Sequence, residues 1–300
     1  MQNKLALGEK SLNPIGLGSN KIKNTSQAQA LILHALQCNV NFFDTANVYH
    51  HGEAEIILSK VLRPYMNKIC LATKGGFEIN TSGKWRVNGT PEAIVKSVNQ
   101  SLHRMKIDSI ELYQLHRIDP HVPLEESIGA LRQLQVAGKI QYIGLSEVSV
   151  EELKKAQQEA TIASVQNYYN LCVRKHNDVL DYCTNNAIIF IPFYPLGSME
   201  NRFPLKMQKT LMTLAEELCV LPQQIALAWL LSRSKYMLPI PGTSSIPHLK
   251  ENMQSAHLKL SSRHIEFIEH TYNQLNKKTF LRKLSARFRK WIWNVEFACS

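Results

Sequence analysis

The 300-residue sequence has no long hydrophobic run. Its apolar stretches are short and bounded by turn residues, whereas a membrane-spanning helix needs about 20 consecutive apolar residues. The first residues, Met1 to Leu5, also lack the apolar core of a secretory signal. With 44% hydrophobic and 20% charged residues, the chain can still bury a large core. We therefore expect a folded, cytoplasmic protein without a transmembrane segment.

Cysteine is scarce and unpaired. The six cysteines form no Cys-x-x-Cys pair and follow no regular spacing, so neither a disulfide framework nor a cysteine-ligated metal site is predicted. His50 and His51 are adjacent, and His116 and His121 lie five residues apart. Neither pair has the i, i+4 spacing of a helical zinc motif, so no metal is expected.

A glycine-rich phosphate turn is missing as well. The segment Gly16-Leu17-Gly18-Ser19-Asn20 lacks the third glycine of the dinucleotide-binding fingerprint. A doubly wound open sheet would need that turn after its first strand. The sequence therefore does not predict such a sheet.

Positive charge is in excess, but most of the excess lies at one end. Residues 277–300 hold seven Lys and Arg against one Glu, which gives +6 of the net charge of +11. The preceding 276 residues carry the remaining +5, which is ordinary for a soluble domain. This distribution does not indicate a nucleic-acid-binding face.

Short apolar segments alternate with amphipathic segments along the chain. The predicted strands are 14–18, 40–44, 69–74, 110–116, 140–146, 162–167, 188–193 and 237–241. The predicted helices are 26–38, 52–62, 91–105, 124–137, 149–159, 174–186 and 222–232. This alternation predicts an α/β protein, a single-domain (β/α)8 barrel over residues 1–276.

Polar residues interrupt the predicted strands at their ends. Asp44, Lys74, His116 and Ser146 each close an apolar segment, and Tyr49 follows Asp44 by five residues. The carboxyl ends of barrel strands form the catalytic rim. An acid, a phenol, an ammonium and an imidazole on one rim indicate a proton-donor site, and therefore an enzyme.

Several motifs then appear in the order seen in aldo-keto reductases, a family that the sequence resembles over about residues 10 to 275. They are Asn41 to Glu53, Thr73-Lys74, Leu112 to Arg117, Gly144 to Glu147, Gln166-Asn167 and Ile240 to Ser245. Within the family, Leu115 to Pro120 and Pro239 to Ser245 are most similar to bacterial pyridoxal-reductase-like oxidoreductases. The resemblance implies reduction of an aldehyde or ketone, with a pyridoxal-like aldehyde as one candidate substrate. We expect the protein to be a monomer.

Four residues carry the expected chemistry. Tyr49 is the predicted proton donor, and the neighbouring ammonium of Lys74 is expected to lower its pKa. Asp44 would hold Lys74 in place, and His116 would polarise the carbonyl oxygen. The long segment 75–90 is expected to shape the substrate pocket, with Trp85 as a substrate contact beside Tyr49 and His116.

The resemblance also implies a set of cofactor contacts. Ser146, Gln166 and Asn167 would hold the carboxamide of the nicotinamide, and Phe193 would stack on its ring. Leu196 and Gly197 would pass over the pyrophosphate. The expected phosphate segment comprises Gly242, Thr243, Ser244, His248, Glu251 and Asn252.

The cofactor itself is expected to be NADPH. Many relatives place Lys or Arg against its 2′-phosphate, whereas this chain has Gly242, Ser245 and His248, with Lys250 nearby. NADH therefore stays open as the alternative. A different function also stays open, a nicotinamide-binding regulatory module with little turnover, as in the potassium-channel beta subunits that share this fold.

The C-terminal segment, residues 277–300, has the pattern of a basic amphipathic helix. Its apolar residues recur every three or four positions between basic ones: Phe280, Leu284, Phe288, Trp291 and Val295. Three interpretations remain: a wall of the substrate pocket, weak contact with a membrane surface, or a helix packed on the outside of the barrel.

Overall fold

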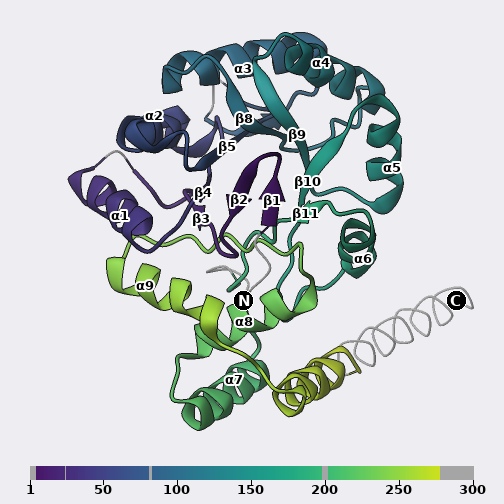
Figure 1. Cartoon of the computed structure of the whole chain (residues 1–300). Helices are drawn as coiled ribbons and strands as arrows, with labels where there is room; N and C mark the ends of the chain where they lie inside the picture. The colour runs from purple at the N-terminus through teal and green to yellow at the C-terminus, as the bar shows by residue number, and fades with distance from the viewer. Residues whose placement is uncertain (1–4, 24, 81–82, 198–201, 278–300) are drawn as a thin grey trace, which may run out of the picture.

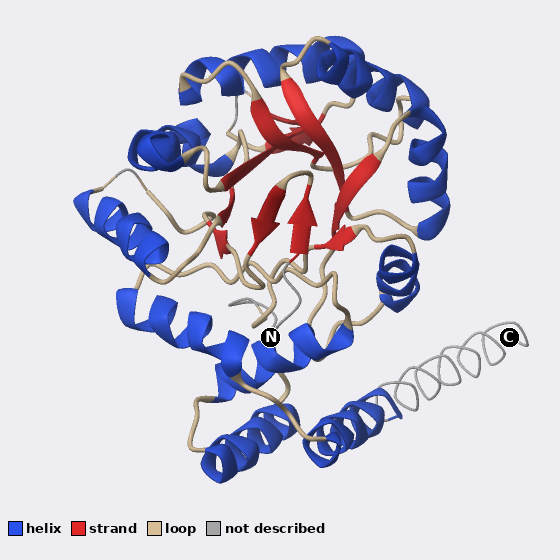
Figure 2. Ribbon diagram, viewed as in Figure 1, coloured by secondary structure: helices blue, strands red, loops and turns tan. Residues whose placement is uncertain are grey.

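The computed structural model describes residues 5–23, 25–80, 83–197 and 202–277. Strands lie in the centre and helices surround them (Figures 1 and 2). Seven parallel strands form one curved sheet in the order β11-β10-β9-β8-β5-β4-β3. Their bounds are β3 (Leu17–Gly18), β4 (Phe42–Asp44), β5 (Cys70–Gly75), β8 (Ile110–Leu115), β9 (Ile140–Ser146), β10 (Ile162–Gln166) and β11 (Ile189–Phe190).

The eighth barrel position is occupied without a regular strand, so the prediction of a strand at 237–241 is wrong in detail. Met237 forms an isolated parallel bridge with Phe190, and Gly242 forms one with Gly18. This extended segment therefore joins the two edge strands, β11 and β3. Pro239 and Pro241 explain the missing ladder, because proline has no N–H to donate.

The predicted helices all form, with ends shifted by a few residues at most. The helices along the chain are α1 (Ser26–Gln37), α2 (Glu53–Leu62), α3 (Pro91–Met105), α4 (Leu124–Val136), α5 (Val150–Glu159), α6 (Asn177–Asn185), α7 (Leu205–Leu218), α8 (Pro222–Arg233) and α9 (Ile246–Gln254). Capping residues determine where two of these helices begin. Ser149 and Glu152 form a capping box at α5, and the Thr90 side chain accepts from Ala93 N at α3.

Side chains alternate between two cores along each strand. Phe42, Cys70 and Leu112 belong to the inner cluster, which fills the barrel, whereas their neighbours Phe43 and Tyr113 belong to the outer cluster. The outer cluster lies between strands and helices. This period of two is the pattern expected for barrel strands.

An N-terminal hairpin that the sequence analysis did not predict completes the inner core. Strands β1 (Leu5–Leu7) and β2 (Lys10–Leu12) pair antiparallel and lie in the middle of the ring of helices (Figure 1). The ammonium of Lys10 donates to the carbonyls of Met66 and Ile69 and to Glu111. The hairpin is thus bound to the loop before β5 and to β8.

Three more elements were absent from the prediction. Segment 75–90 contains a second hairpin, β6 (Phe77–Ile79) with β7 (Trp85–Val87). Helix α7 and a helical segment over residues 262–277 lie beyond the barrel strands. Arg174 pairs with Glu269 at 2.5 Å and its guanidinium lies 3.6 Å from the ring centroid of Tyr272. These contacts bind the last helical segment to the domain.

In the described part of the chain, no single helix is long and apolar enough to cross a membrane, and only the bent pair α7 and α8 meets the criteria of length and composition. The predicted amphipathic extension lies outside the described residues from position 278 onward. Its three interpretations therefore stay predictions.

Candidate active site

A cavity of about 1220 Å³ opens at the carboxyl ends of the strands. The predicted residues Tyr49, Trp85, His116, Ser146 and Phe193 line it. Sites for drug-sized ligands span about 300–1,000 Å³, so this cavity has room for a larger molecule. Its position is the one predicted for the catalytic rim.

Lys74 is the centre of the polar site. It lies one residue before the end of β5, and its side chain is 0% exposed. Its Nζ donates to Asp44 Oδ2 at 2.6 Å and to the Thr45 carbonyl at 2.8 Å. Burial tends to lower the pKa of Lys74, but the charge of Asp44 and the phenol of Tyr49 raise it above its ordinary value. The ammonium therefore stays charged in the core.

Tyr49 is brought to this ammonium by a strained turn. It begins a short 3-10 turn, η1 (Tyr49–Gly52), in which His50, His51 and Gly52 all have positive φ. Positive φ at two histidines costs about 1–3 kcal/mol each, so the surrounding structure must enforce the turn. The result is a phenol ring whose centroid lies 5.2 Å from Lys74 Nζ.

The net pKa of Tyr49 differs from the expectation. Burial raises it above the ordinary value of 10.0, and the charge and hydrogen bond of Lys74 lower it without outweighing burial. The effect of Lys74 thus has the predicted sign, whereas the predicted net lowering of the Tyr49 pKa is wrong. A phenol with a raised pKa is fully protonated at neutral pH, which suits a proton donor.

His116 follows β8, the strand beside that of Lys74; its backbone N–H donates to the Gly75 carbonyl at 2.7 Å, and the residue is 7% exposed. Its ring packs edge-on against Tyr49, with centroids 6.1 Å apart, and against Phe77 at 4.9 Å. Burial, followed by the charges of Lys74 and Arg117, holds the pKa of His116 well below 6.5. The imidazole is therefore neutral at physiological pH and can donate a hydrogen bond without carrying charge.

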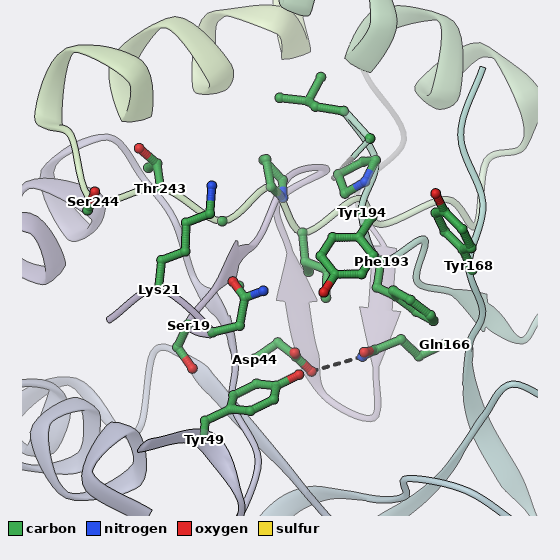
Figure 3. A pocket seen from close by; sticks show the side chains of 18 of the residues that line it. Ser19, Lys21, Asp44, Tyr49, Gln166, Tyr168, Phe193, Tyr194, Thr243 and Ser244 are labelled. Atoms are coloured by element: carbon green, nitrogen blue, oxygen red, sulfur yellow. Dashed lines mark hydrogen bonds between the residues drawn. The ribbon is translucent and has the colours of Figure 1, made fainter. Parts of the chain in front are cut away.

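Asp44 accepts hydrogen bonds from other residues besides Lys74. Its Oδ1 accepts from Gln166 Nε2 at 2.9 Å and from Gln114 Nε2 at 3.1 Å (Figure 3 shows the contact with Gln166). Gln166 also donates to Gln114 Oε1 at 3.2 Å. Gln114 was absent from the predicted site, although a glutamine inside an apolar strand is a signal that could have found it.

The predicted carboxamide contacts are only partly brought together. Ser146 and Gln166 line the cavity, but Asn167 does not. Both amide atoms of Asn167 bind the backbone of Val148, with Nδ2 donating at 2.8 Å and Oδ1 accepting at 3.1 Å. The side chain of Asn167 therefore holds the loop that follows β9.

Phe193 forms part of an aromatic cluster. It stacks on Tyr168 with centroids 5.4 Å apart and an interplanar angle of 18°, and Tyr194 packs edge-on at 5.4 Å (Figure 3). All three residues line the cavity, together with Leu196 and Gly197. One wall of the site is thus aromatic, and the stacking of Phe193 on a nicotinamide ring stays a prediction.

The predicted phosphate segment forms the other side of the cavity. Gly242, Thr243, Ser244, His248 and Asn252 line it, whereas Glu251 does not and accepts from Gln223 instead. The bridge between Gly18 and Gly242 brings the Ser19 to Lys21 loop beside this segment (Figure 3). A Cβ at Gly242 would lie 2.7 Å from Asn20 Oδ1, so a larger residue there would require the Asn20 side chain to move.

Three cations in the cavity wall were not predicted as site residues. Among the described residues that line it, Lys21, Arg117 and Arg202 are the Lys and Arg side chains, and Asp44 is the one carboxylate. Because Asp44 is paired with Lys74, the wall has an excess of positive charge. Lys21 and Arg202 are exposed loop residues, and nothing in their sequence surroundings distinguishes them from other surface cations.

Comparisons with known proteins identify the family. The Aldo/keto reductase family model matches residues 14–273. An uncharacterised oxidoreductase of Schizosaccharomyces pombe is 37% identical over 265 residues, which is 85% of each chain. The pyridoxine 4-dehydrogenase of Escherichia coli is 34% identical over 274 residues, 86% of this chain and 94% of that one. The chain belongs to the aldo/keto reductase family.

Solved structures show the same fold. An aldo/keto reductase of Klebsiella pneumoniae in complex with NADP and acetate covers 91% of this chain and 96% of its own, at 23% identity and a TM-score of 0.79. The glycerol dehydrogenase of Gluconobacter oxydans has the same coverages at 22% identity and a TM-score of 0.83. The predicted (β/α)8 barrel and the predicted class, an oxidoreductase of this family, are confirmed.

Proposed function

We propose that this protein is an NADPH-dependent carbonyl reductase in which Tyr49 is the proton donor. The observation that carries the proposal is the buried contact between Lys74 and Asp44 at 2.6 Å, beside the ring of Tyr49. Asp44 and Tyr49 line the large cavity, and Lys74 lies directly behind them. A buried charge pair is costly to maintain, and perturbed groups that line a cavity favour a catalytic role.

The cavity fits a nicotinamide dinucleotide phosphate. Its volume suits a ligand of that size, and its excess of positive charge suits phosphate groups. Ser146 and Gln166 would hold the carboxamide, and Phe193 would stack on the ring. The loop with Lys21 and the segment with Thr243 would hold phosphate. The relatives agree, because an S. pombe protein named as an NADP(+) aldo-keto reductase is 32% identical to this chain.

The side chains can then carry out the proton transfer. Bound NADPH supplies the hydride to the carbonyl carbon. Negative charge develops on the carbonyl oxygen, and Tyr49 Oη delivers a proton to it. Lys74 stabilises the phenolate that remains, and Asp44 keeps Lys74 in position. Neutral His116 donates a hydrogen bond to the same oxygen and orients the substrate.

For the substrate, we propose a pyridoxal-like aldehyde. The E. coli pyridoxine 4-dehydrogenase acts, by its name, on the corresponding alcohol. In this chain the rings of Trp85 and Phe77 lie 5.7 Å apart at the edge of the cavity, and Trp85 is 50% exposed. An aromatic surface of this kind suits a flat heteroaromatic ring.

The alternative is a nicotinamide-binding regulatory module. Binding alone would require the aromatic wall and the phosphate segment, but not a buried lysine next to a tyrosine. The Asp44–Lys74 pair therefore favours an enzyme.

The test is an assay of NADPH oxidation with a panel of carbonyl compounds that includes pyridoxal, a benzaldehyde and a simple ketone, run in parallel with NADH. Pyridoxine formation is followed by chromatography. We expect turnover with aldehydes and a preference for NADPH. Tight NADPH binding without turnover of any carbonyl would favour the regulatory module, and absence of dinucleotide binding would contradict both functions.

A further inference from the structure

Arg117 directly follows the predicted catalytic His116, at the carboxyl end of β8. It is partly buried and lines the cavity. One guanidinium nitrogen, Nη1, donates to the His116 carbonyl at 2.7 Å and to Ser146 Oγ at 3.0 Å. Within the described residues, no hydrogen bond uses Nε or Nη2. The guanidinium is thus held by one nitrogen, and its other donors are free for a ligand.

Arg117 also lacks a partner of opposite charge. In the described part of the chain, no Asp or Glu oxygen lies within 4.0 Å of its guanidinium. Asp44 is occupied by Lys74. Glu147 acts on Arg117 electrostatically, but its carboxylate accepts from the Tyr168 amide and pairs with Lys175 at 3.1 Å. A partly buried cation without a carboxylate is unfavourable unless a ligand supplies the anion.

The position of Arg117 separates it from the predicted phosphate segment. Its guanidinium carbon lies 5.8 Å from the ring centroid of Phe193, and its charge acts on Tyr49 and His116. Lys21, by contrast, lies beside Thr243 and Ser244, on the side of the cavity away from Phe193 (Figure 3). Arg117 therefore belongs to the end of the cavity where the proton donor is.

We propose that Arg117 makes this site selective for carbonyl substrates that carry an acidic group, a carboxylate or a phosphate. The free guanidinium donors bind the acidic group while His116 and Tyr49 bind the carbonyl oxygen. The inference rests on the proposed reductase function and narrows its substrate class, because aldehydes with an acidic group, such as pyridoxal 5′-phosphate, would then be preferred to neutral pyridoxal.

The experiment compares matched substrates. The acid 4-carboxybenzaldehyde is compared with its neutral methyl ester, and pyridoxal 5′-phosphate is compared with pyridoxal, so that carboxylate and phosphate are tested separately. The variants are Arg117→Gln and Arg117→Lys. Lys60→Gln, an exposed position on α2 outside the cavity, removes the same charge as a control. NADPH affinity of each protein is measured by fluorescence titration.

In the wild type and in Lys60→Gln we expect at least one acidic substrate to exceed its neutral partner in kcat/KM by about tenfold or more, as a charge-assisted hydrogen bond provides. Arg117→Gln should lose this ratio, and Arg117→Lys should keep part of it. The inference is wrong if the wild type shows no preference, or if Arg117→Gln retains it. A parallel loss of NADPH affinity in Arg117→Gln would also overturn it, because Arg117 would then serve the cofactor.

A binding measurement keeps the inference separate from the proposed function. Binding of benzoate, an anion, and of benzamide, its neutral analogue, is measured by quenching of tryptophan fluorescence in the presence of NADP. This measures the effect of the acidic group on binding without turnover. If no carbonyl is reduced, the proposed function fails, and tighter binding of benzoate that depends on Arg117 still supports the inference. Equal binding of both compounds contradicts it.

Discussion

Gln166 donates from Nε2 to Asp44 Oδ1 at 2.9 Å, although 122 residues separate the two along the chain. The other oxygen of the same carboxylate accepts from Lys74. Asp44 therefore joins the predicted cofactor contact to Lys74, the lysine beside the predicted proton donor Tyr49. Gln166 uses its side-chain Nε2 to donate to Asp44 and Gln114. The side-chain oxygen, Oε1, is therefore left to accept from the NH₂ of the nicotinamide carboxamide.

Asp44→Asn is expected to damage stability and activity together. The substitution leaves the buried ammonium of Lys74 without its counter-charge, and removing one partner of a buried ion pair costs about 3–5 kcal/mol. We expect a fall of that size in the free energy of unfolding, measured in urea, and the loss of most reductase activity. Asp108→Asn, at an exposed position, provides the matched control. A stable and active Asp44→Asn protein would show that the ion pair is dispensable.

His116 is expected to make the fold sensitive to acid. Its folded pKa lies well below 6.5, so the unfolded chain takes up a proton there first and stability is lost as pH falls below 6.5. Between pH 6.5 and 5.5 this effect amounts to about 1 kcal/mol. Urea unfolding of the wild type and of His116→Gln at pH 5.5, 6.5 and 7.5 measures it. We expect the wild type to lose more stability; identical losses would rule out a neutral buried imidazole.

Lys21 is expected to set the preference for NADPH over NADH. It lines the cavity beside Thr243 and Ser244, where the 2′-phosphate is predicted to bind (Figure 3). Lys21→Met should weaken NADPH binding by about tenfold, the value of one charge-assisted hydrogen bond, and should leave NADH binding nearly unchanged. Lys23→Met, an exposed neighbour outside the cavity, is the control. Equal losses of affinity for NADPH and NADH would show that Lys21 contacts a part of the dinucleotide other than the 2′-phosphate.

The rim positions of three proposed catalytic residues could be predicted because each interrupts an apolar segment at its end. Asp44, Lys74 and His116 are polar residues directly after buried ones, and parallel strands carry such positions to one rim. The structure places them there. The barrel was predictable for the same reason, since the alternation of strands and helices is visible in the apolar pattern.

Other features depend on tertiary contacts that leave little trace in the sequence. Pro239 and Pro241 leave the eighth strand position without a ladder, although its apolar residues still predict a strand. Asn167 seemed a cofactor contact by its place in a motif, but Val148 takes both its amide atoms. Lys21 and Arg202 reach the cavity only because the loops that carry them fold over it.

The most direct test of the proposed mechanism is the single-turnover rate of NADPH oxidation by Tyr49→Phe. The phenylalanine ring keeps the shape of the site and removes only the hydroxyl that gives the proton. We expect the rate to fall by about 10²–10⁴-fold, the usual contribution of a general acid, while NADPH affinity changes little. Tyr65→Phe, outside the cavity, should react like the wild type. A Tyr49→Phe protein that keeps more than about a tenth of the wild-type rate would contradict Tyr49 as the proton donor.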